Sequence, residues 1–388
     1  MFIPYARQSI SEDDIAAVAK VLRSEFLTQG PVVPAFEDAL AIYCKATNAI
    51  AMNSATSALH VACLALGIGP GDIVWTSPIS FVASANCALY CGARVDFVDI
   101  DSQTFNMSIE ALATKLAAAK LTNTLPKVVI PVHLAGQSCD MASIHALARE
   151  YDFKIIEDAS HAIGGSYQGH LVGSCDYSDI TVLSFHPVKI ITSGEGGMAL
   201  TNNSQLAESM FRLRSHGITR DRNLFQHAAD GPWYYEQIEL GFNYRLTDIA
   251  AALGLSQFQR IDSFVARRNE IARNYDSLFS GSLFTTPTIH DGVISAFHLY
   301  VIRMPFTGDE KQRFFELAQK NGVGLNVHYI PIYRHPYYSS MGFDIANYPA
   351  AERYYSEAVS IPMYADLSAD NQEFVCKSLI DCLEKTVH

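Results

Sequence analysis

The sequence lacks any apolar run that approaches the roughly 20 residues needed to cross a bilayer. Its first residues, MFIPYARQSISEDDI, turn acidic at once, with no basic segment followed by an apolar one. We therefore expect neither a signal peptide nor a membrane anchor. The sequence predicts a cytoplasmic protein that has no membrane as a partner.

Cysteine pairs at metal-binding or disulfide spacing are lacking as well. The chain has 8 cysteines, but no C-x-x-C motif occurs, and Cys87 with Cys91 has no matching second pair. This pattern argues against a zinc site and against a disulfide framework. It favours buried thiols in a reducing compartment. We expect no metal ion.

Positive charge is scarce, because 28 Lys and Arg stand against 40 Asp and Glu, for a formal net charge of -12. An acidic surface argues against nucleic acid as the main partner, although a local pocket can still bind a phosphorylated ligand. The 388 residues are enough for two domains, and 49% hydrophobic residues are typical of a folded enzyme.

An alternation of apolar segments and helical patterns fills the first two thirds of the chain. Segments with apolar residues at helical spacing separate short apolar runs, which predict strands. The runs are mostly continuous, as expected where helices cover both faces of a sheet. We predict a large α/β domain with a mainly parallel sheet over residues 1–254. The predicted strands are 49–52, 72–77, 94–100, 127–133, 153–158 and 179–185.

The pattern changes near residue 245. Residues 247–279 read as one long helix or as two in tandem. Beyond them, strands and helices of a different arrangement follow, and we predict a smaller α+β domain over residues 255–388. Its predicted strands are 298–304 and 322–329, and its predicted helices are 309–321 and 370–385.

Ligands of α/β sheets bind beyond the carboxyl ends of the strands, so the residues that follow each predicted strand are candidates for a site. The small residues from Asn53 to Ser57 run directly from a strand into a helix. The free N–H groups and the positive dipole end of such a helix suit a phosphate. Taken alone, serine and threonine at a helix start are usually only caps.

A carboxylate, an amine and an aromatic ring follow other strands. Asp158 ends one strand, Lys189 follows another, and Phe81 stands after a third. Singly, a phenylalanine is usually in the core and a lysine on the surface. Together they match pyridoxal phosphate. The amine forms a Schiff base with its aldehyde, the carboxylate keeps the pyridine nitrogen protonated, and the ring lies against an apolar face.

Five motifs stand in this order along the chain and together resemble those of a known family: NSATSALHVA, SPISFVASANCALYCGA, EDASHAIGG, SFHPVKIITSGEGG and LGFNYRLTDIAAALGLSQF. The sequence is similar to the sugar aminotransferases of the DegT/DnrJ/EryC1/StrS family over essentially its whole length. The resemblance implies a pyridoxal-phosphate enzyme of fold type I, the aspartate aminotransferase-like fold, and an obligate homodimer with shared active sites.

By matched position, the resemblance implies a role for each cofactor residue. Lys189 matches the Schiff-base lysine, which is the catalytic residue, and Asp158 matches the partner of the pyridine nitrogen. His161 matches the contact on the side of the 3-hydroxyl, and Phe81 matches the aromatic that stacks on the ring. The positions that match phosphate contacts are Ala55, Thr56, Ser184 and, from the neighbouring subunit, Asn243.

The resemblance also implies the substrates. LTQGP, FRLRSHG and NVHYIPIY resemble segments of members that use glutamate to aminate a UDP-linked 4-keto-6-deoxy-N-acetylhexosamine. The alternative is another 4-keto or 3-keto sugar, linked to dTDP, GDP or UDP. Arg245 is a candidate contact for a carboxylate or a diphosphate. The positions expected at the nucleotide-sugar site are Tyr5, Leu27, Thr28, Ala55, Ser184, Asn243, Arg245, Asn326, His328 and Tyr329.

Two other functions are compatible with a pyridoxal-phosphate site. A protein that binds pyridoxal phosphate without turnover is disfavoured by the complete set of lysine, aspartate and phosphate residues. A cysteine desulfurase shares the fold type but needs a cysteine in a mobile glycine-rich loop. No cysteine stands in such a loop near the five motifs.

Overall fold

A seven-stranded sheet forms the centre of the computed structural model, which describes residues 2–387. Its strand order is β1-β9-β8-β5-β4-β2-β3, and only β9 runs against the other six. The expected mainly parallel α/β sheet is confirmed. The strands are β1 Asn48–Met52, β2 Ile73–Thr76, β3 Arg94–Phe97, β4 Val128–Ile130, β5 Lys154–Asp158, β8 Ile180–Ser184 and β9 Gly197–Thr201.

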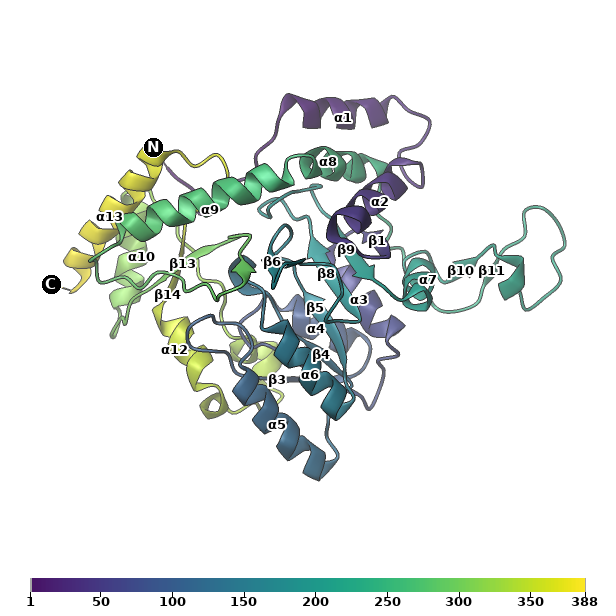
Figure 1. Cartoon of the computed structure of the whole chain (residues 1–388), viewed down its shortest axis with the longest axis horizontal. Helices are drawn as coiled ribbons and strands as arrows, with labels where there is room; N and C mark the ends of the chain where they lie inside the picture. The colour runs from purple at the N-terminus through teal and green to yellow at the C-terminus, as the bar shows by residue number, and fades with distance from the viewer. Residues whose placement is uncertain (1, 388) are drawn as a thin grey trace.

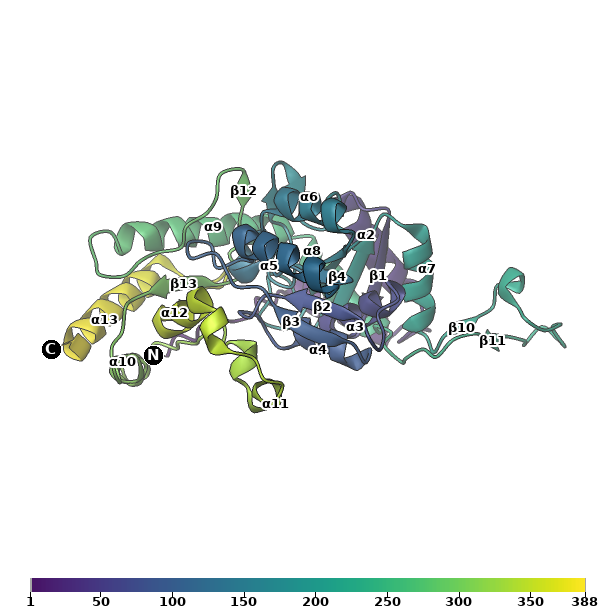
Figure 2. The ribbon, with the colours of Figure 1, turned by 90° about the horizontal axis from the view of Figure 1, so that it is seen from below.

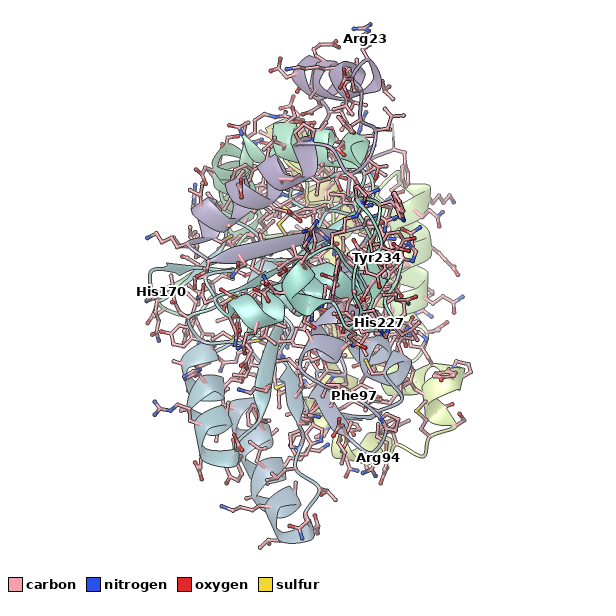
Figure 3. The ribbon with its side chains drawn as sticks, turned by 90° about the vertical axis from the view of Figure 1, so that its right-hand side faces the viewer. Arg23, Arg94, Phe97, His170, His227 and Tyr234 are labelled. Carbon is pink, nitrogen blue, oxygen red and sulfur yellow. The ribbon has the colours of Figure 1, made fainter. Side chains whose placement is uncertain are left out.

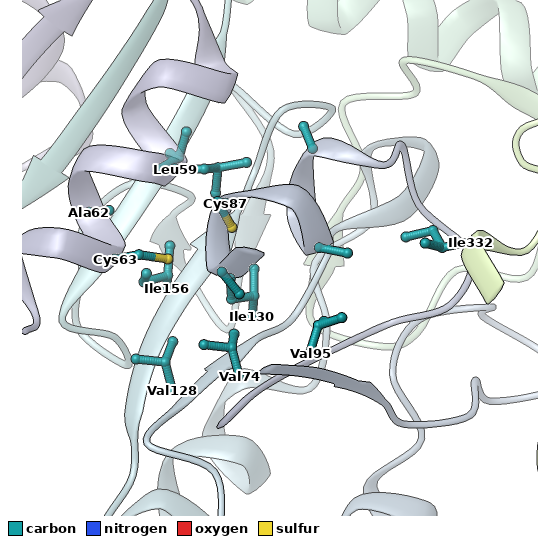
Figure 4. Packing of buried hydrophobic residues seen from close by; sticks show 14 of the residues in the cluster. Leu59, Ala62, Cys63, Val74, Cys87, Val95, Val128, Ile130, Ile156 and Ile332 are labelled. Atoms are coloured by element: carbon teal, nitrogen blue, oxygen red, sulfur yellow. The ribbon is translucent and has the colours of Figure 1, made fainter. Parts of the chain in front are cut away.

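Alternate residues of the strands face two different layers of helices. On one face, Ile130 and Ile156 pack against Cys63 of α3 and Cys87 of α4 (Figure 4). On the other face, Leu183 packs with α2, while neighbouring strands pack with α5 and α6. Burial on both faces explains the continuous apolar runs. The helices of these layers are α2 Val32–Cys44, α3 Ala55–Ala65, α4 Ala83–Tyr90, α5 Ile109–Thr122, α6 Met141–Tyr151 and α7 Ser204–Leu213.

A separate core joins the elements of the C-terminal third. Tyr275 of α9, Tyr300 of β13 and Phe314 of α10 are buried in it together, and Ile3 from the start of the chain packs with them. These elements lie on one side of the sheet, where the N-terminus also lies (Figures 1 and 2). The elements that contribute to this core are α9 Ile261–Leu278, β13 Tyr300–Arg303, α10 Glu310–Lys320, β14 Ala358–Ile361 and α13 Ala369–Val387. The two other helices in this part of the chain, α8 Asp248–Phe258 and α12 Pro349–Glu357, pack instead on the cores of the large sheet.

The sequence was less informative in this part of the chain. Residues 247–279 form two helices in tandem, α8 and α9. The predicted strand at 322–329 is wrong, because the backbone there makes only single bridges, Ile3 with Val323 and Asn326 with Ser360. The strand that pairs with β13 is β14, which was not predicted. The proposed domain boundary between residues 254 and 255 falls inside α8 and stays a prediction.

An arm projects from the body between α7 and α8 (Figures 1 and 2). Its strands β10 (Ile218–Thr219) and β11 (Glu236–Gln237) pair antiparallel at its base. Figure 3 faces the arm and shows His227 and Tyr234 on it. The remaining short elements are α1 Glu12–Leu22, β6 Ser166–Tyr167, β7 His170–Leu171, β12 Val293–Ile294 and α11 Pro336–Ser339.

Residues 2–387 lack two features that would indicate other functions. No helix there has both the length and the apolar composition of a bilayer-spanning segment. Across the same residues, no three histidine, cysteine or acidic side chains are grouped so that they could hold a metal ion.

One buried carboxylate joins the start of α2 to the start of α8. Asp248, which is 0% exposed, accepts hydrogen bonds from the backbone N–H of Gly30 and Val32 at 2.8 Å and of Val33 at 3.3 Å. Pro31, at the N-cap of α2, makes no side-chain capping bond. A residue 216 positions along the chain from Val32 therefore caps this helix.

We expect Asp248→Ala to lower the free energy of unfolding by about 1 to 3 kcal/mol, because buried N–H groups lose their acceptor. Urea denaturation measures the change. Asp248→Asn keeps one oxygen and should lose less, and the exposed Asp291→Ala should change the stability by less than about 0.5 kcal/mol. Equal stability of the Asp248→Ala and Asp291→Ala variants would contradict the capping role.

Candidate active site

A cavity of about 740 Å³, called the cleft below, opens where β1, β5 and β8 end. This is the edge at which α/β sheets bind ligands, and the volume is typical of a small-molecule site. The structure therefore brings together most of the residues that the sequence selected. Those that line the cleft are Tyr5, Ala55, Thr56, Phe81, Asp158, His161, Ser184, Lys189, His328 and Tyr329.

The start of α3 forms one wall of the cleft. Ser54 caps the helix, and its Oγ accepts the N–H of Ser57 at 3.1 Å. The hydroxyl of Ser57 in turn donates to Asn53 Oδ1 at 2.6 Å. The N–H groups of Ala55 and Thr56 lie in the first turn, where the helix itself has no carbonyl to accept them. They can bind an anion, which the helix dipole also favours.

Strand β9 approaches this helix start so closely that only glycine fits. A Cβ on Gly197 would overlap the backbone nitrogen of Ala55 and the carbonyl carbon of Ser54. Gly194, in the turn just before, has a φ of 81°, which residues with a side chain rarely adopt. The SGEGG segment thus supplies both a turn and a close backbone contact.

Asp158 ends β5 with its carboxylate buried and hydrogen-bonded on both oxygens. Oδ2 accepts the hydroxyl of Ser84 at 2.6 Å, and Oδ1 accepts the hydroxyl of Ser160 at 2.6 Å. Among the described residues, no Lys, Arg or His nitrogen lies within 4.0 Å of it. A buried carboxylate without a cation fits a protonated pyridine nitrogen in the cleft.

Lys189 stands in the connection between β8 and β9, with its amine in the cleft. Exclusion of water lowers the pKa of Lys189 from its ordinary value to about 8, although the charge of Asp158 opposes the fall. At pH 7 roughly a tenth of the amine is then neutral, compared with far less than 1% for an ordinary lysine. A neutral amine can attack an aldehyde and accept a proton.

Histidine and tyrosine side chains form the wall nearest Lys189. The N–H of Ala135 donates to Nδ1 of His161 at 3.3 Å, and Nε2 of His161 lies 3.1 Å from the hydroxyl of Tyr329. Burial, followed by the charge of Lys189, lowers the pKa of His161 well below its usual range. The neutral ring therefore carries its proton on Nε2 and donates it to the oxygen of Tyr329. The Tyr329 hydroxyl is left to donate to a ligand.

Phe81 is unusually exposed for a large apolar residue. It is 58% exposed although it lines the cleft, and its ring centroid lies 6.3 Å from that of Tyr329. A large apolar ring with one open face is a suitable surface for a flat heterocycle.

Several residues expected at the sugar site do not line the cleft of their own chain. Thr28 pairs with Thr247, and Arg245 pairs with Met52 at the end of β1. Asn326 contacts Nε2 of His328 through its side-chain nitrogen at 3.3 Å. The residues in question are Leu27, Thr28, Asn243, Arg245 and Asn326.

The sequence also missed residues that line the cleft or hold a residue that lines it. Ser84 and Ser160 hold Asp158, Glu195 lies in the glycine segment, and His298 contacts Lys189. Ser160 was accessible to prediction, because it stands two residues after Asp158. His298 stands just before a strand of the other core and belongs to none of the five motifs.

Comparisons with known proteins agree with this geometry. The family model described as the DegT/DnrJ/EryC1/StrS aminotransferase family matches residues 8–380. A Campylobacter jejuni (strain 81-176) protein named UDP-4-amino-4,6-dideoxy-N-acetyl-β-L-altrosamine transaminase is 39% identical over 385 residues, which are 99% of this chain and 98% of that protein.

Two solved structures share the fold along the whole chain. Helicobacter pylori PseC, an aminotransferase of pseudaminic acid biosynthesis, superposes with a TM-score of 0.90 at 33% identity, covering 99% of this chain and 100% of PseC. The PLP form of Spr1654 from Streptococcus pneumoniae, described as a sugar aminotransferase, gives a TM-score of 0.90 at 30% identity and covers 100% of both chains. The predicted fold class is confirmed.

We expect the free amine of Lys189, in protein freed of cofactor, to react with acetic anhydride with a pH midpoint of about 8. Competitive labelling followed by mass spectrometry of the peptide that carries Lys189 measures it. Asp158→Asn should move the midpoint lower, because the aspartate charge favours the ammonium form. A midpoint near that of an ordinary lysine, or an upward move in Asp158→Asn, would contradict the assignment.

Proposed function

Because the chain belongs to the DegT/DnrJ/EryC1/StrS aminotransferase family, we propose that it transfers the amino group of glutamate to a UDP-linked 4-keto-6-deoxy-N-acetylhexosamine. The product is UDP-4-amino-4,6-dideoxy-N-acetyl-β-L-altrosamine. The observation that carries the proposal is the similarity, along nearly the whole chain, to the Campylobacter jejuni transaminase named for that compound.

The family confirms the reaction class and the cofactor that the sequence predicted: the chain is a sugar aminotransferase that depends on pyridoxal phosphate. When bound, the cofactor supplies an aldehyde that exchanges the amino group and a ring that accepts electrons from the carbon losing its proton. The residues of the cleft suit this group. They offer N–H donors for a phosphate, a carboxylate that has no cation, and a ring with one open face.

Under this proposal each end of the cofactor has its own partners. The first-turn N–H groups of Ala55 and Thr56, with the hydroxyl of Ser184, hold the phosphate. Asp158 and Phe81 both line the cleft, where Asp158 would face the pyridine nitrogen and Phe81 would cover the ring. His161, at the histidine wall, lies on the side of the 3-hydroxyl.

Lys189 Nζ transfers the protons of the reaction. With its pKa lowered to about 8, the amine takes the proton from the carbon of the donor amino acid and returns one to the carbon of the sugar in the second half of the reaction. Tyr5, His328 and Tyr329 line the same cleft, and under the proposal they contact the sugar. The buried Tyr329 hydroxyl, whose pKa burial raises above its usual value, stays protonated and donates to the sugar.

A panel of nucleotide keto sugars tests the specific substrate. With glutamate as donor, we expect the UDP-linked 4-keto-6-deoxy-N-acetylhexosamine to give a kcat/KM at least about 100-fold above those of dTDP- and GDP-linked 4-keto sugars. Formation of 2-oxoglutarate is the measurement. Lys189→Ala, the matched control, should keep its fold but lose turnover. A preference for a dTDP or GDP sugar would overturn the substrate and leave the reaction class intact.

We further propose that two copies of the chain share their active sites, so that Asn243 and Arg245 serve the cleft of the partner. In support, neither residue lines the cleft of its own chain. Both lie in the segment that follows the projecting arm, and this arm extends away from the body of the chain (Figure 1). The asparagine would contact the phosphate, and the arginine would contact a carboxylate or a diphosphate.

Mixed dimers test the sharing of sites. The Lys189→Ala and Asn243→Ala variants should each have low activity alone, and co-expression with two different tags isolates the mixed dimer. If the asparagine acts across the interface, one site of that dimer holds both native residues, and about half of the wild-type activity returns. If it acts within its own chain, no site is complete. Failure to recover activity would therefore exclude the shared site.

A further inference from the structure

The amine of Lys189 has one hydrogen-bond partner among the described residues, and it is His298. Lys189 Nζ lies 3.5 Å from Nε2 of His298, whose side chain is only 2% exposed. The histidine precedes β13 and reaches the cleft from the C-terminal core, while the lysine reaches it from the connection that follows β8. Two parts of the fold thus meet at this contact.

The surroundings of His298 keep its ring neutral. Cations or imidazoles face it from each neighbouring element: Lys189, His161, His328 and, on α9, Arg268. Burial and these charges lower the pKa of His298 well below its usual range. No carboxylate oxygen lies within 4.0 Å of its ring among residues 2–387, so nothing there stabilises an imidazolium.

The proton of the neutral ring can be placed. A charged amine can only donate, so in that state Nε2 accepts and the proton of the ring sits on Nδ1. Nδ1 is buried and has no hydrogen-bond partner among the described residues. A buried donor without an acceptor carries a desolvation penalty, which an apolar side chain at this position would avoid. A histidine serving only to fill space would be a poor choice.

We propose that His298 is a positioning residue that holds the amine of Lys189 through a neutral acceptor. The contact fixes the direction of Nζ in the cleft whenever the amine is free of the cofactor. An acidic partner would also fix it, but would favour the ammonium form and reduce the neutral amine that the reaction needs. The inference rests on the role of Lys189 proposed above. It explains why the hydrogen-bond partner of Lys189 is an uncharged histidine and not an acid.

Three substitutions separate orientation from charge. His298→Gln keeps an uncharged acceptor near the position of Nε2, His298→Leu removes the acceptor, and His298→Glu replaces it with a negative charge. His145→Gln is the matched control, because His145 is half-buried on α6 and contacts the carbonyl of Tyr177, outside the cleft. Circular dichroism and thermal unfolding establish that each variant folds.

The first readout needs neither cofactor nor substrate. Competitive acetylation of Lys189 in the cofactor-free full-length chain gives the pH midpoint of the amine. We expect His298→Gln and His145→Gln to keep it near 8. We expect His298→Glu to raise it by about 1 to 3 pH units. An unmoved midpoint in a folded His298→Glu variant would overturn the proposal, whatever sugar the enzyme uses.

The second readout divides kcat from KM in the holoenzyme, with glutamate as donor and release of 2-oxoglutarate as the signal. His298→Leu should lower kcat by about 10-fold to 100-fold, because the amine loses its direction, and should leave the KM for glutamate within about 3-fold. His298→Gln should restore most of kcat. Equal rates for the folded Gln and Leu variants would show that the side chain only fills space.

Discussion

The common direction of six strands is the constraint on which the rest of the structure depends. Because β1, β5 and β8 end at one edge, polar residues that follow separate apolar runs meet in a single cleft. Burial on both faces of the sheet leaves the strand ends as the natural place for polar groups, so the demands of the core and of the chemistry agree. Because β9 pairs antiparallel with β8, the connection between them turns at this same edge, and it places Lys189 in the cleft.

Among residues 2–387, neither Asp158 nor Lys189 has an oppositely charged side chain paired with it in the cleft. Asp158 is buried with hydroxyl donors and no cation, while Lys189 is surrounded by neutral imidazoles rather than by an acid of its own. Each group can therefore interact with the cofactor, which the protein chain itself does not supply. Ion pairing between side chains of the chain would stabilise the resting protein and weaken its affinity for that partner.

The sequence predicted the residues that depend on local order. Asp158 and Lys189 directly end or follow apolar runs, so the position of each run also places the residue at the sheet edge. His298 was beyond such reasoning, because 109 positions separate it from Lys189 and only the packing of the C-terminal core against the sheet brings it there. The error at 322–329 has a related cause. An extended apolar segment reads the same whether it pairs along its length or bridges at single points, and the partner decides which.

The contact between Gly197 and the start of α3 has a consequence for how the cleft keeps its dimensions. Lys189 lies in the connection that leads into β9, and Gly197 is the first residue of β9. The backbone of Gly197 lies directly against the backbone of Ala55. The separation between the backbone of β9 and the anion-binding N–H groups is thus set by main-chain atoms in contact, with no side chain between them to adapt. Any change that displaced β9 would therefore also displace the start of α3, where the N–H groups that we propose for the phosphate lie.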